Sequence, residues 1–404
     1  MLTETVMRRP IRLICLALAL LVSGVLAPIV ATADRARALR PVPDPDRGLL
    51  LDDGDVQSLR EAVTQSLAWI DRQPPKRRLV FGPVAVTAAQ QARGLRRFLE
   101  LLGDEPGREV PIARILAEFD LLKSVGGPGG EMLVTGYYEP VIDAAETESP
   151  EYPVPILGVP DDLVEVAAAP ATAGPENGRV IGRLEGPRIV PYWSRAEITA
   201  RRLARRGRVV AWARDPVDVF FMEIEGSGAL RFPDGRELRL SHATTNGRPY
   251  RSIGRLLINE GKIEREAMSM PAIRAWLAAN PADRARVLHH NESYVFFRYR
   301  DGPPVGSFGV PLTPGRSIAT DARLFPPGAL AFVRTERPTA AAAGKVEWTP
   351  MSRFVLNQDT GGAIRGPGRV DVFWGRGVEA ELAAGLMKQP GELYFLVPKD
   401  SQLR

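Results

Sequence analysis

The feature that most constrains this fold is a change in hydrophobic pattern near residue 131. Before it, apolar residues such as Val56, Leu59 and Val63 recur every three or four positions, a spacing typical of amphipathic helices. After it, short apolar runs bounded by Gly and Pro predict strands. The 404 residues include 38 Gly and 36 Pro, which favours many turns. We therefore predict a mainly β fold with N-terminal helices.

Three helices are predicted in the N-terminal part. The first spans residues 56–70. The second begins at Thr87, where Gln90 completes a capping box. The third covers the run "IARILAEFDLLKSV" at residues 112–125. Residues 34–50, with the Pro-rich "PVPDPDRG", are predicted to form an extended linker.

The rest of the chain is predicted to be rich in strands. The runs "VDVFFMEIEGSGALRF" (217–232) and "RELRLS" (236–241), separated by Pro-Asp-Gly, predict a hairpin. Short helices are predicted at residues 252–261 and from Ser269. Towards the C-terminus five apolar runs predict strands, interrupted by one helix in "GVEAELAAGLMK". The Ala- and Pro-rich run at 167–178 is predicted to be a surface loop.

Residues 1–33 have the pattern of an export signal. A basic segment with three arginines precedes the apolar run 13–30, and Ala31-Thr32-Ala33 forms a small-x-small cleavage site. This predicts a periplasmic protein whose mature chain starts near Asp34, with an uncleaved membrane anchor as the alternative. Cys15 begins the apolar run, whereas a lipoprotein cysteine ends it after small residues, so we predict no lipid attachment there.

Charge and rare residues narrow the classes of function. The net charge is +5, and removing residues 1–33, which carry three arginines and one glutamate, leaves +3. This mildly basic net charge suits an anionic polymer as partner. The basic residues are too widely spread along the chain to indicate nucleic acid. The mature chain has three histidines and no cysteine. We therefore predict no His/Cys metal cluster, no disulfide and no cofactor.

The run "NQDTGGAIRG" makes Asp359 a candidate catalytic acid. An aspartic protease needs two D-T/S-G half-sites that share one proton, and no second one occurs in this chain. Glycines after a catalytic acid let a bulky polymer approach and free backbone amides as donors, a use open to Gly361 and Gly362. The alternative is an ordinary turn in which Asp359 caps backbone amides. Asp321 and Asp371 also stand at predicted strand boundaries.

Seven motifs occur in a fixed order along the chain. They are "TGYYEP" at 135–140, "IEGSG" at 224–228, "NGRPYRSIGRLLINEGKI" at 246–263, "MSMPAIRAWL" at 268–277, "NESYVFF" at 291–297, "VPLTPGRSIATDARLFPPG" at 310–328 and "QDTGGAIRGPGRVDVFWGRG" at 358–377. The ordered series resembles the membrane-bound lytic transglycosylase A (MltA) family with its C-terminal three-aspartate (3D) domain. The likeness runs from about residue 130 to the C-terminus and is more specific than any single motif.

The resemblance implies a murein lytic transglycosylase, a lyase of the exolytic type. Such an enzyme cleaves the β-1,4 bond between N-acetylmuramic acid and N-acetylglucosamine in peptidoglycan and leaves a 1,6-anhydromuramic end. The implied fold is a double-psi β-barrel domain, here 34–140 and 292–404, with a second β-domain inserted at 141–291. Glycan would bind in the groove between them. Peptidoglycan glycan strands are the expected partners, with the cell-wall synthesis and division machinery as a further one.

The resemblance also implies roles for individual residues. The family's catalytic aspartate falls on Asp359, and its other two aspartates fall on Asp321 and Asp371. Where the family commonly has Gln before Gly-Ser-Gly, this chain has Glu225, a new negative charge near the expected groove. Aromatic rings stack on sugars and short polar side chains bond their hydroxyl groups, although the tyrosines fit core packing equally well. The expected groove residues are Tyr137, Tyr138, Glu225, Ser227, Asn246, Tyr250, Gly361 and Gly362.

One carboxyl group is sufficient for this chemistry. A hydrolytic glycosidase needs a second carboxylate, whereas here the nucleophile is the C6 hydroxyl of the muramic residue, which is already held next to C1. We expect Asp359 to protonate the glycosidic oxygen and then to take the proton from the C6 hydroxyl as it closes on C1. The alternatives are a hydrolase that uses Glu225 as its base and a wall-binding barrel without catalysis.

Overall fold

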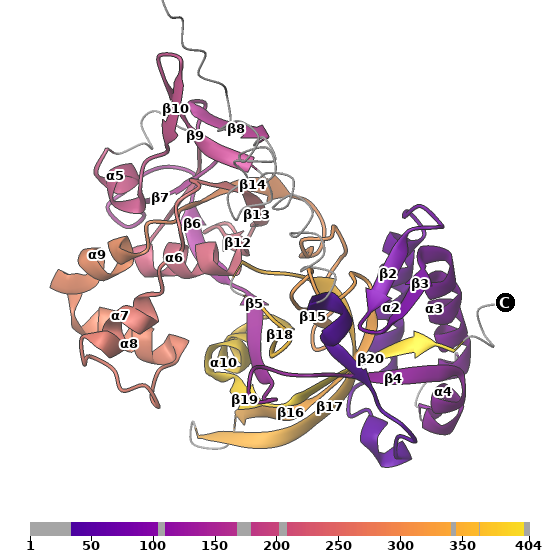
Figure 1. The fold of residues 1–404 in the computed structure, drawn as a ribbon. Coiled ribbons are helices and arrows are strands. Elements are labelled where there is room, and N and C mark those ends of the chain that lie inside the picture. Colours follow the sequence, from indigo (N-terminus) through magenta and orange to yellow (C-terminus); the bar gives the residue numbers. More distant parts are fainter. Residues whose placement is uncertain are drawn as a thin grey trace, which may run out of the picture.

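The computed structural model describes residues 34–103, 110–167, 179–201, 208–340, 345–362 and 364–399. The predicted leader at 1–33 lies outside these ranges, and so does nearly all of the predicted surface loop at 167–178. In the described ranges the fold is mixed α/β with more strand than helix, and it contains two main sheets (Figure 1).

The larger sheet is built from both ends of the chain. Strands that precede residue 140 lie on both sides of a central block of strands that follow residue 316. The order is β1 (Leu39–Pro41), β4 (Phe119–Ser124), β20 (Glu392–Pro398), β16 (Leu330–Ala340), β17 (Val346–Asp359), β15 (Ser317–Ala319), β18 (Arg369–Arg376), β5 (Leu133–Glu139) and β19 (Lys388–Pro390). The pairs β15–β17 and β5–β18 are parallel, and the other neighbours are antiparallel.

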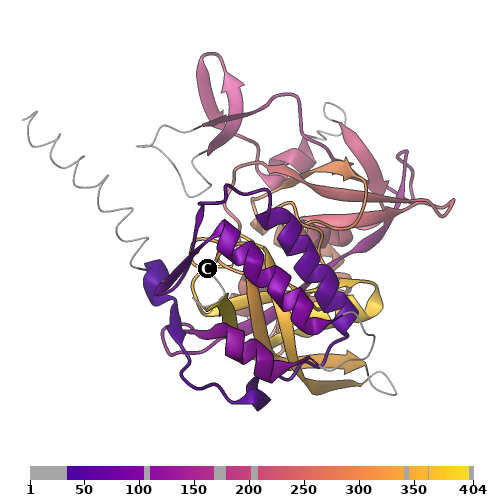
Figure 2. The ribbon, with the colours of Figure 1, turned by 90° about the vertical axis from the view of Figure 1, so that its right-hand side faces the viewer.

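Helices α2 (Val56–Ile70) and α3 (Ala88–Leu102) cover one face of this sheet (Figure 2). Phe98 of α3 is fully buried, and its ring meets that of Phe354 on β17 with centroids 5.3 Å apart. Burying one such side chain stabilises the fold by about 1.5–3 kcal/mol. Helix α10 (Val378–Leu386) packs against β5 and β18.

The predictions for the N-terminal part are confirmed for two of three helices. Helix α3 begins with the expected capping box between Thr87 and Gln90. The third helix, α4 (Ile112–Glu118), is shorter than predicted, because β4 follows it directly and pairs with β20. The predicted linker at 34–50 is wrong. It contains β1, paired with β4, and a 3-10 helix, η1 (Arg47–Leu50).

A second, six-stranded sheet is formed by the middle of the sequence. Its order is β14 (Val295–Arg300), β13 (Glu237–Thr245), β12 (Ser227–Arg231), β6 (Val141–Ala145), β11 (Val209–Ala213) and β7 (Val154–Leu157). A small sheet of β10 (Arg188–Pro191), β9 (Arg179–Glu185) and β8 (Leu163–Ala167) lies at the top of Figure 1. The hairpin β2 (Arg78–Phe81) and β3 (Val84–Thr87) accompanies the N-terminal helices.

The predicted central hairpin is confirmed only in its second half. Strands β12 and β13 pair around the Pro-Asp-Gly turn, but the run predicted as the start of the first strand is helix α6 (Pro216–Glu225). Asp215 caps its first turn by accepting a hydrogen bond from the Val217 amide. Gly226, with a φ of 75°, ends the helix in the left-handed region that favours glycine.

Four further helices lie on the same part of the chain: α5 (Arg195–Ala200), α7 (Ile253–Asn259), α8 (Met270–Ala279) and α9 (Pro281–His290). Helices α7 and α8 confirm the predictions at 252–261 and from Ser269, whereas α5 and α9 were not predicted. None of the helices in the described ranges is long and apolar enough to span a membrane.

Candidate active site

Two of the three predicted aspartates flank one short strand, β15. Its residue Ala319 pairs with Asp359 of β17 on one side and with Asp371 of β18 on the other. Because neighbouring strands lie about 4.8 Å apart, the two aspartate Cα atoms are roughly 10 Å apart. Thr135 of β5 pairs with Asp371 in turn. The row of four residues crosses the middle of the larger sheet and brings Asp359 and Asp371 together.

Asp359 is half-buried at the end of β17, and three donors orient its carboxyl group. Oδ1 accepts hydrogen bonds from the amides of Ser307 (2.7 Å) and Thr360 (2.8 Å). Oδ2 accepts one from the hydroxyl of Tyr137 (3.0 Å) on β5. The amide capping of an ordinary turn is therefore present, but it is combined with a contact from a distant part of the chain.

The contact with Ser307 depends on Gly306. A Cβ at Gly306 would lie 2.4 Å from the Gln358 carbonyl oxygen and 3.1 Å from the Asp359 Cβ, so a larger residue would push this loop away. The Ser307 hydroxyl also donates to the Thr360 carbonyl at 3.0 Å. Sequence analysis missed Ser307, because a Gly-Ser pair in a Pro-rich loop was its only signal.

Tyr137 is the residue around which the acidic side chains gather. Its ring packs on that of Phe373, with centroids 5.2 Å apart. Burial raises the pKa of Tyr137 well above its ordinary value, and nearby negative charges raise it further. Those charges belong to Asp359, Asp371 and Glu225. The phenol therefore stays protonated and remains a hydrogen-bond donor across the neutral range.

Asp371 is a paired carboxylate. Its Oδ1 accepts a hydrogen bond from Arg369 Nε at 3.1 Å and another from the hydroxyl of Thr135. The side chain is 14% exposed. Asp371 therefore adds negative charge beside Tyr137 while its own charge is balanced by Arg369. Sequence analysis did not select Thr135 or Arg369, because only the strand register brings them to Asp371.

Asp321 faces away from this group. It is fully buried just after β15 and accepts hydrogen bonds from the amides of Arg323 (3.1 Å) and Gly366 (2.8 Å). The Arg323 side chain pairs with it at 2.6 Å. Burial alone would raise the pKa of Asp321, but these hydrogen bonds outweigh burial and lower it. Asp321 thus ties the turn after β15 to the loop that follows Asp359.

Glu225 approaches the acidic side chains around Tyr137 from the side of the smaller sheet. It is the last residue of α6, and its Oε2 accepts a hydrogen bond from the Tyr138 amide at 3.4 Å. Burial raises the pKa of Glu225 to about 8, against the opposing effect of that hydrogen bond. The charge of Asp371 adds to the rise, and Arg274 works against it. Ser227, two residues further on, is half-buried at the start of β12.

The other predicted groove residues differ in exposure. Tyr138 is 4% exposed and packs against Ala380 and Ala384 of α10, so the core-packing alternative describes it. Tyr250 is 53% exposed. Partial burial raises its pKa, while a hydrogen bond with Ser252 and the positive charges of Arg369 and Arg195 oppose that rise.

The two glycines after Asp359 are not required by backbone strain. Neither Gly361 nor Gly362 has a positive φ. A Cβ at Gly362 would meet nothing within 4 Å, whereas one at Gly361 would lie 3.3 Å from Ile364. The turn after Asp359 therefore has room for a side chain at Gly362.

Asn246 belongs to a buried polar network instead of the groove. It is fully buried, and its Nδ2 donates to the carbonyls of Trp193 (2.8 Å) and Glu292 (2.9 Å). Its Oδ1 accepts from the Tyr294 amide at 2.9 Å. Because these contacts use both ends of the amide group, the structure gives Asn246 a structural role in place of the predicted glycan contact.

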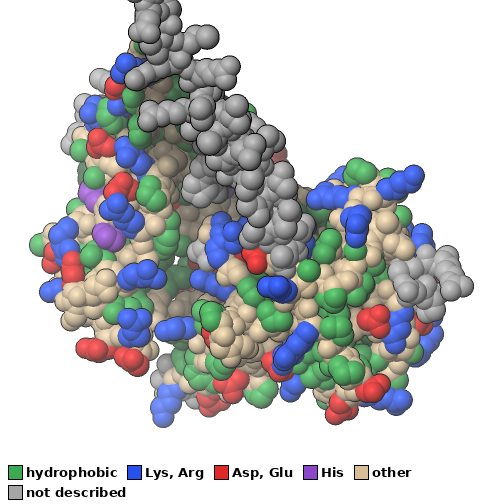
Figure 3. All heavy atoms as spheres, in the orientation of Figure 1, with side chains coloured by type: hydrophobic (Ala, Val, Ile, Leu, Met, Phe, Trp, Pro, Cys, Tyr) green, Lys and Arg blue, Asp and Glu red, His purple; other side chains and the backbone are tan. Residues whose placement is uncertain are grey.

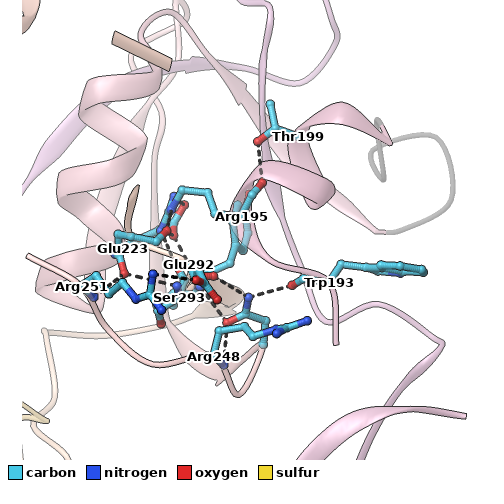
Figure 4. Close-up of polar contacts among 12 residues, drawn as sticks. Trp193, Arg195, Thr199, Glu223, Arg248, Arg251, Glu292 and Ser293 are labelled. Carbon is cyan, nitrogen blue, oxygen red and sulfur yellow. Dashed lines mark hydrogen bonds and ion pairs between the residues drawn. The ribbon is translucent and has the colours of Figure 1, made fainter. Parts of the chain in front are cut away.

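The same network contains a buried ion pair (Figure 4). Arg195 Nη2 lies 2.7 Å from Glu223 Oε2, and both side chains are less than 10% exposed. Arg195 also donates to the carbonyls of Asn291 (3.0 Å) and Ser293 (2.5 Å). The Val295 amide donates to Glu223 at 3.1 Å. This network joins α5, α6 and β14.

Lys and Arg side chains are spread over both parts of the molecule. On the face drawn in Figure 3, they lie on the part at left and on the helical part at right, interspersed with Asp and Glu side chains. Within the described ranges, no group of three or more His, Cys, Asp or Glu residues is arranged to hold a metal ion.

Two family models match this chain. The MltA specific insert domain matches residues 133–298, and the 3D domain matches residues 316–397. The first range includes Tyr137 and Glu225, and the second includes Asp321, Asp359 and Asp371.

Relatives and solved structures agree with these matches. Membrane-bound lytic murein transglycosylase A of Escherichia coli (strain K12) is 35% identical over 66% of this chain and 66% of its own length. The crystal structure of a membrane-bound lytic murein transglycosylase from Agrobacterium tumefaciens has a TM-score of 0.71 at 31% identity, covering 91% of this chain and 100% of that one. Escherichia coli MltA with bound chitohexaose has a TM-score of 0.67 at 27% identity, covering 90% and 95%.

The two-sheet fold, its central acidic site and these relatives place the chain in the class of lytic transglycosylases. Within that class, the chain belongs to the MltA family, with an MltA insert domain and a 3D domain. Its homologues are enzymes whose names describe them as membrane-bound, and one of them has been seen with a glycan chain, chitohexaose.

Proposed function

We propose that this chain is a murein lytic transglycosylase with Asp359 as its catalytic acid and base. It cleaves the β-1,4 bond between N-acetylmuramic acid and N-acetylglucosamine and leaves a 1,6-anhydromuramic end. The observation that carries the proposal is the hydrogen bond between Asp359 Oδ2 and the Tyr137 hydroxyl. It holds one half-buried carboxyl group beside an open, glycine-containing turn, in a chain whose homologues are lytic transglycosylases.

The donors around Asp359 assign the proton to one oxygen. The amides of Ser307 and Thr360 can only donate, and both bond to Oδ1, so the acidic proton is carried by Oδ2. Oδ2 gives this proton to the glycosidic oxygen as the bond from C1 to that oxygen breaks. The carboxylate then accepts the proton of the C6 hydroxyl as O6 bonds to C1. Between the two transfers, the Tyr137 hydroxyl stabilises the charged Oδ2.

The two alternatives fit the site less well. A hydrolase would need Glu225 to be ionised in order to activate water. Burial raises the pKa of Glu225 to about 8, which leaves it mostly protonated at neutral pH. A wall-binding barrel without catalysis has little use for a carboxyl group held open to solvent by three donors. Transglycosylation is therefore the better reading.

We also infer that the larger sheet closes as a double-psi barrel with an inserted domain. Support comes from the two parallel pairs, β15–β17 and β5–β18, and from the return of β19 to β16. There the Thr335 hydroxyl donates to the Pro390 carbonyl at 2.9 Å. Because β14 pairs with β13 in the smaller sheet, we place the second domain boundary after residue 300 in place of 291.

Location and partners complete the proposal. We propose that residues 1–33 direct the chain to the periplasm, where peptidoglycan glycan strands are its substrate and the wall synthesis and division machinery its partner. The membrane-bound names of the homologues support a place in the cell envelope. Exolytic action is part of the same proposal.

The test is mass spectrometry of soluble muropeptides released from purified sacculi. The wild type should release products one water lighter than reducing-end muropeptides, and Asp359→Asn should release none. Asp301→Asn, which changes an exposed aspartate outside the site, is the matched control and should behave as the wild type. Full-mass reducing ends would mean hydrolysis, and no release by the wild type would leave a wall-binding protein.

A further inference from the structure

Glu225 is half-buried and differs in its contacts from the fully buried carboxyl groups. Within the described ranges it forms no ion pair, and the donor that it contacts is the Tyr138 amide, at 3.4 Å from Oε2. Asp321, in contrast, receives two amides and an arginine side chain. Glu225 is also the last residue of α6, where the unpaired helix carbonyls carry partial negative charge. The lack of an ion pair and the position at the end of α6 both make an ionised carboxylate unfavourable here, and the Tyr138 hydrogen bond is the one feature that favours it.

The charged and titratable groups that face Glu225 come from several elements. Tyr138 lies on β5, and Asp371 on β18 adds a negative charge. Arg274 on α8 is the opposing cation, but its guanidinium is bonded to Asp218 at 2.5 Å and lies over the Phe221 ring. The full set is Tyr137, Tyr138, Asp371, Arg274 and, beyond the Tyr137 hydroxyl, Asp359.

We propose that Glu225 works as a neutral carboxylic acid that donates a hydrogen bond to the bound glycan, as a specificity-determining residue. The Tyr138 amide occupies Oε2, so the proton lies on Oε1. A sugar hydroxyl or an acetamido carbonyl oxygen accepts it. Ionised, the same group could only accept, and it would place a second negative charge beside Asp371. This inference rests on the proposed function, because it concerns the same site.

The first measurement is calorimetric binding of chitohexaose between pH 6.5 and 9.5. For the wild type we expect the affinity to fall above pH 8, because the donor is lost as Glu225 ionises. The slope of this fall should approach a factor of about ten per pH unit. Glu225→Gln keeps a donor of the same shape that does not titrate, so its affinity should stay level. Glu225→Ala should bind about tenfold more weakly at neutral pH. Glu264→Gln, an exposed glutamate outside the site, should match the wild type.

The second measurement is muropeptide release, with KM and kcat determined separately. The alkaline effect should appear in KM and be absent from Glu225→Gln. An alkaline fall that persists in Glu225→Gln, or unchanged binding by Glu225→Ala, would overturn the inference. If anhydro products form but no Glu225 variant differs, only this inference fails. If binding depends on Glu225 as expected but no variant forms anhydro products, the proposed function fails alone.

Discussion

Helix α6 carries two glutamates whose neighbours have opposite charge. Glu223 faces a cation: Arg195 lies 2.7 Å away, and the Val295 amide bonds to the same carboxylate. Glu225, two residues later, faces Asp371 and forms no ion pair within the described ranges. Because successive helical residues are rotated by about 100°, the two side chains point to different sides of α6.

The difference shows how to separate structural from functional buried charge. The network around Arg195 pairs its guanidinium with the Glu223 carboxylate and with the carbonyls of Asn291 and Ser293. The group around Tyr137 gathers Asp359, Asp371 and Glu225, whose charges raise the pKa of the Tyr137 phenol. The first arrangement stabilises one packing of the chain, and the second is the site to which we assign proton transfer in the proposed function.

The largest expected effect is on the structural side of this comparison. Glu223→Ala leaves Arg195 buried without its partner, and we expect the free energy of unfolding to fall by about 3–5 kcal/mol. Urea unfolding measures this loss. The double variant Arg195→Met/Glu223→Leu, which removes both charges, should recover much of it. Equal stabilities of Glu223→Ala and wild type would remove the distinction between the two clusters.

The second effect is on the functional side. Tyr137→Phe removes the donor to Asp359 Oδ2, and we expect kcat to fall about 10- to 100-fold, since a hydrogen bond to a charged group contributes about 1.5–3 kcal/mol. The free energy of unfolding should change by less than about 1 kcal/mol, because the ring and its packing remain. Tyr299→Phe, which removes a hydrogen bond from a tyrosine outside the site to the Val210 carbonyl (2.6 Å), is the matched control and should leave kcat unchanged. A stability loss without a fall in kcat would make Tyr137 a structural residue.

The smallest effect concerns Asp321, which was predicted as a supporting acid. Its pKa is lowered in the fold, so its ionised form stabilises the protein above the ordinary aspartate pKa and this contribution is lost as the pH falls towards the folded value. We expect Asp321→Asn to lower the free energy of unfolding at pH 7 by about 1–2 kcal/mol and to reduce its decline between pH 5 and 3. Urea unfolding at the three pH values tests this. If Asp321→Asn has the stability of the wild type but a much lower kcat, Asp321 is instead part of the catalytic group.

Local patterns predicted the elements whose signals are local. The capping box at Thr87 and the apolar spacing of α2 identified two helices correctly. Helix α6 was taken for a strand because it is apolar on nearly all sides, which hides the helical period. Strand β4 was taken for helix because its apolar residues follow α4 without a break, and only pairing with β20 makes them a strand.

The site residues that lie within the ordered motifs could be selected from the sequence. The ordered motifs selected Asp359, Tyr137 and Glu225, which the structure brings together. Ser307 could not be predicted, because its contact with Asp359 depends on how closely a loop approaches at Gly306. Asn246 was misassigned, since a motif gives residue order and not the direction of a side chain.

The pairing of early with late strands in the larger sheet has a consequence for how the chain folds. Thr135 and Asp371, neighbours across β5 and β18, are 236 residues apart. The pairings of β5 with β18 and of β4 with β20 cannot form until the last strands have been made, because each must close a very long loop. Until then the edges of β4 and β5 that these strands cover are unpaired, and such edges are templates for association with other chains. A chain that emerges N-terminus first therefore carries these unpaired edges until its last strands are made, and the site around Asp359 is among the last parts to assemble.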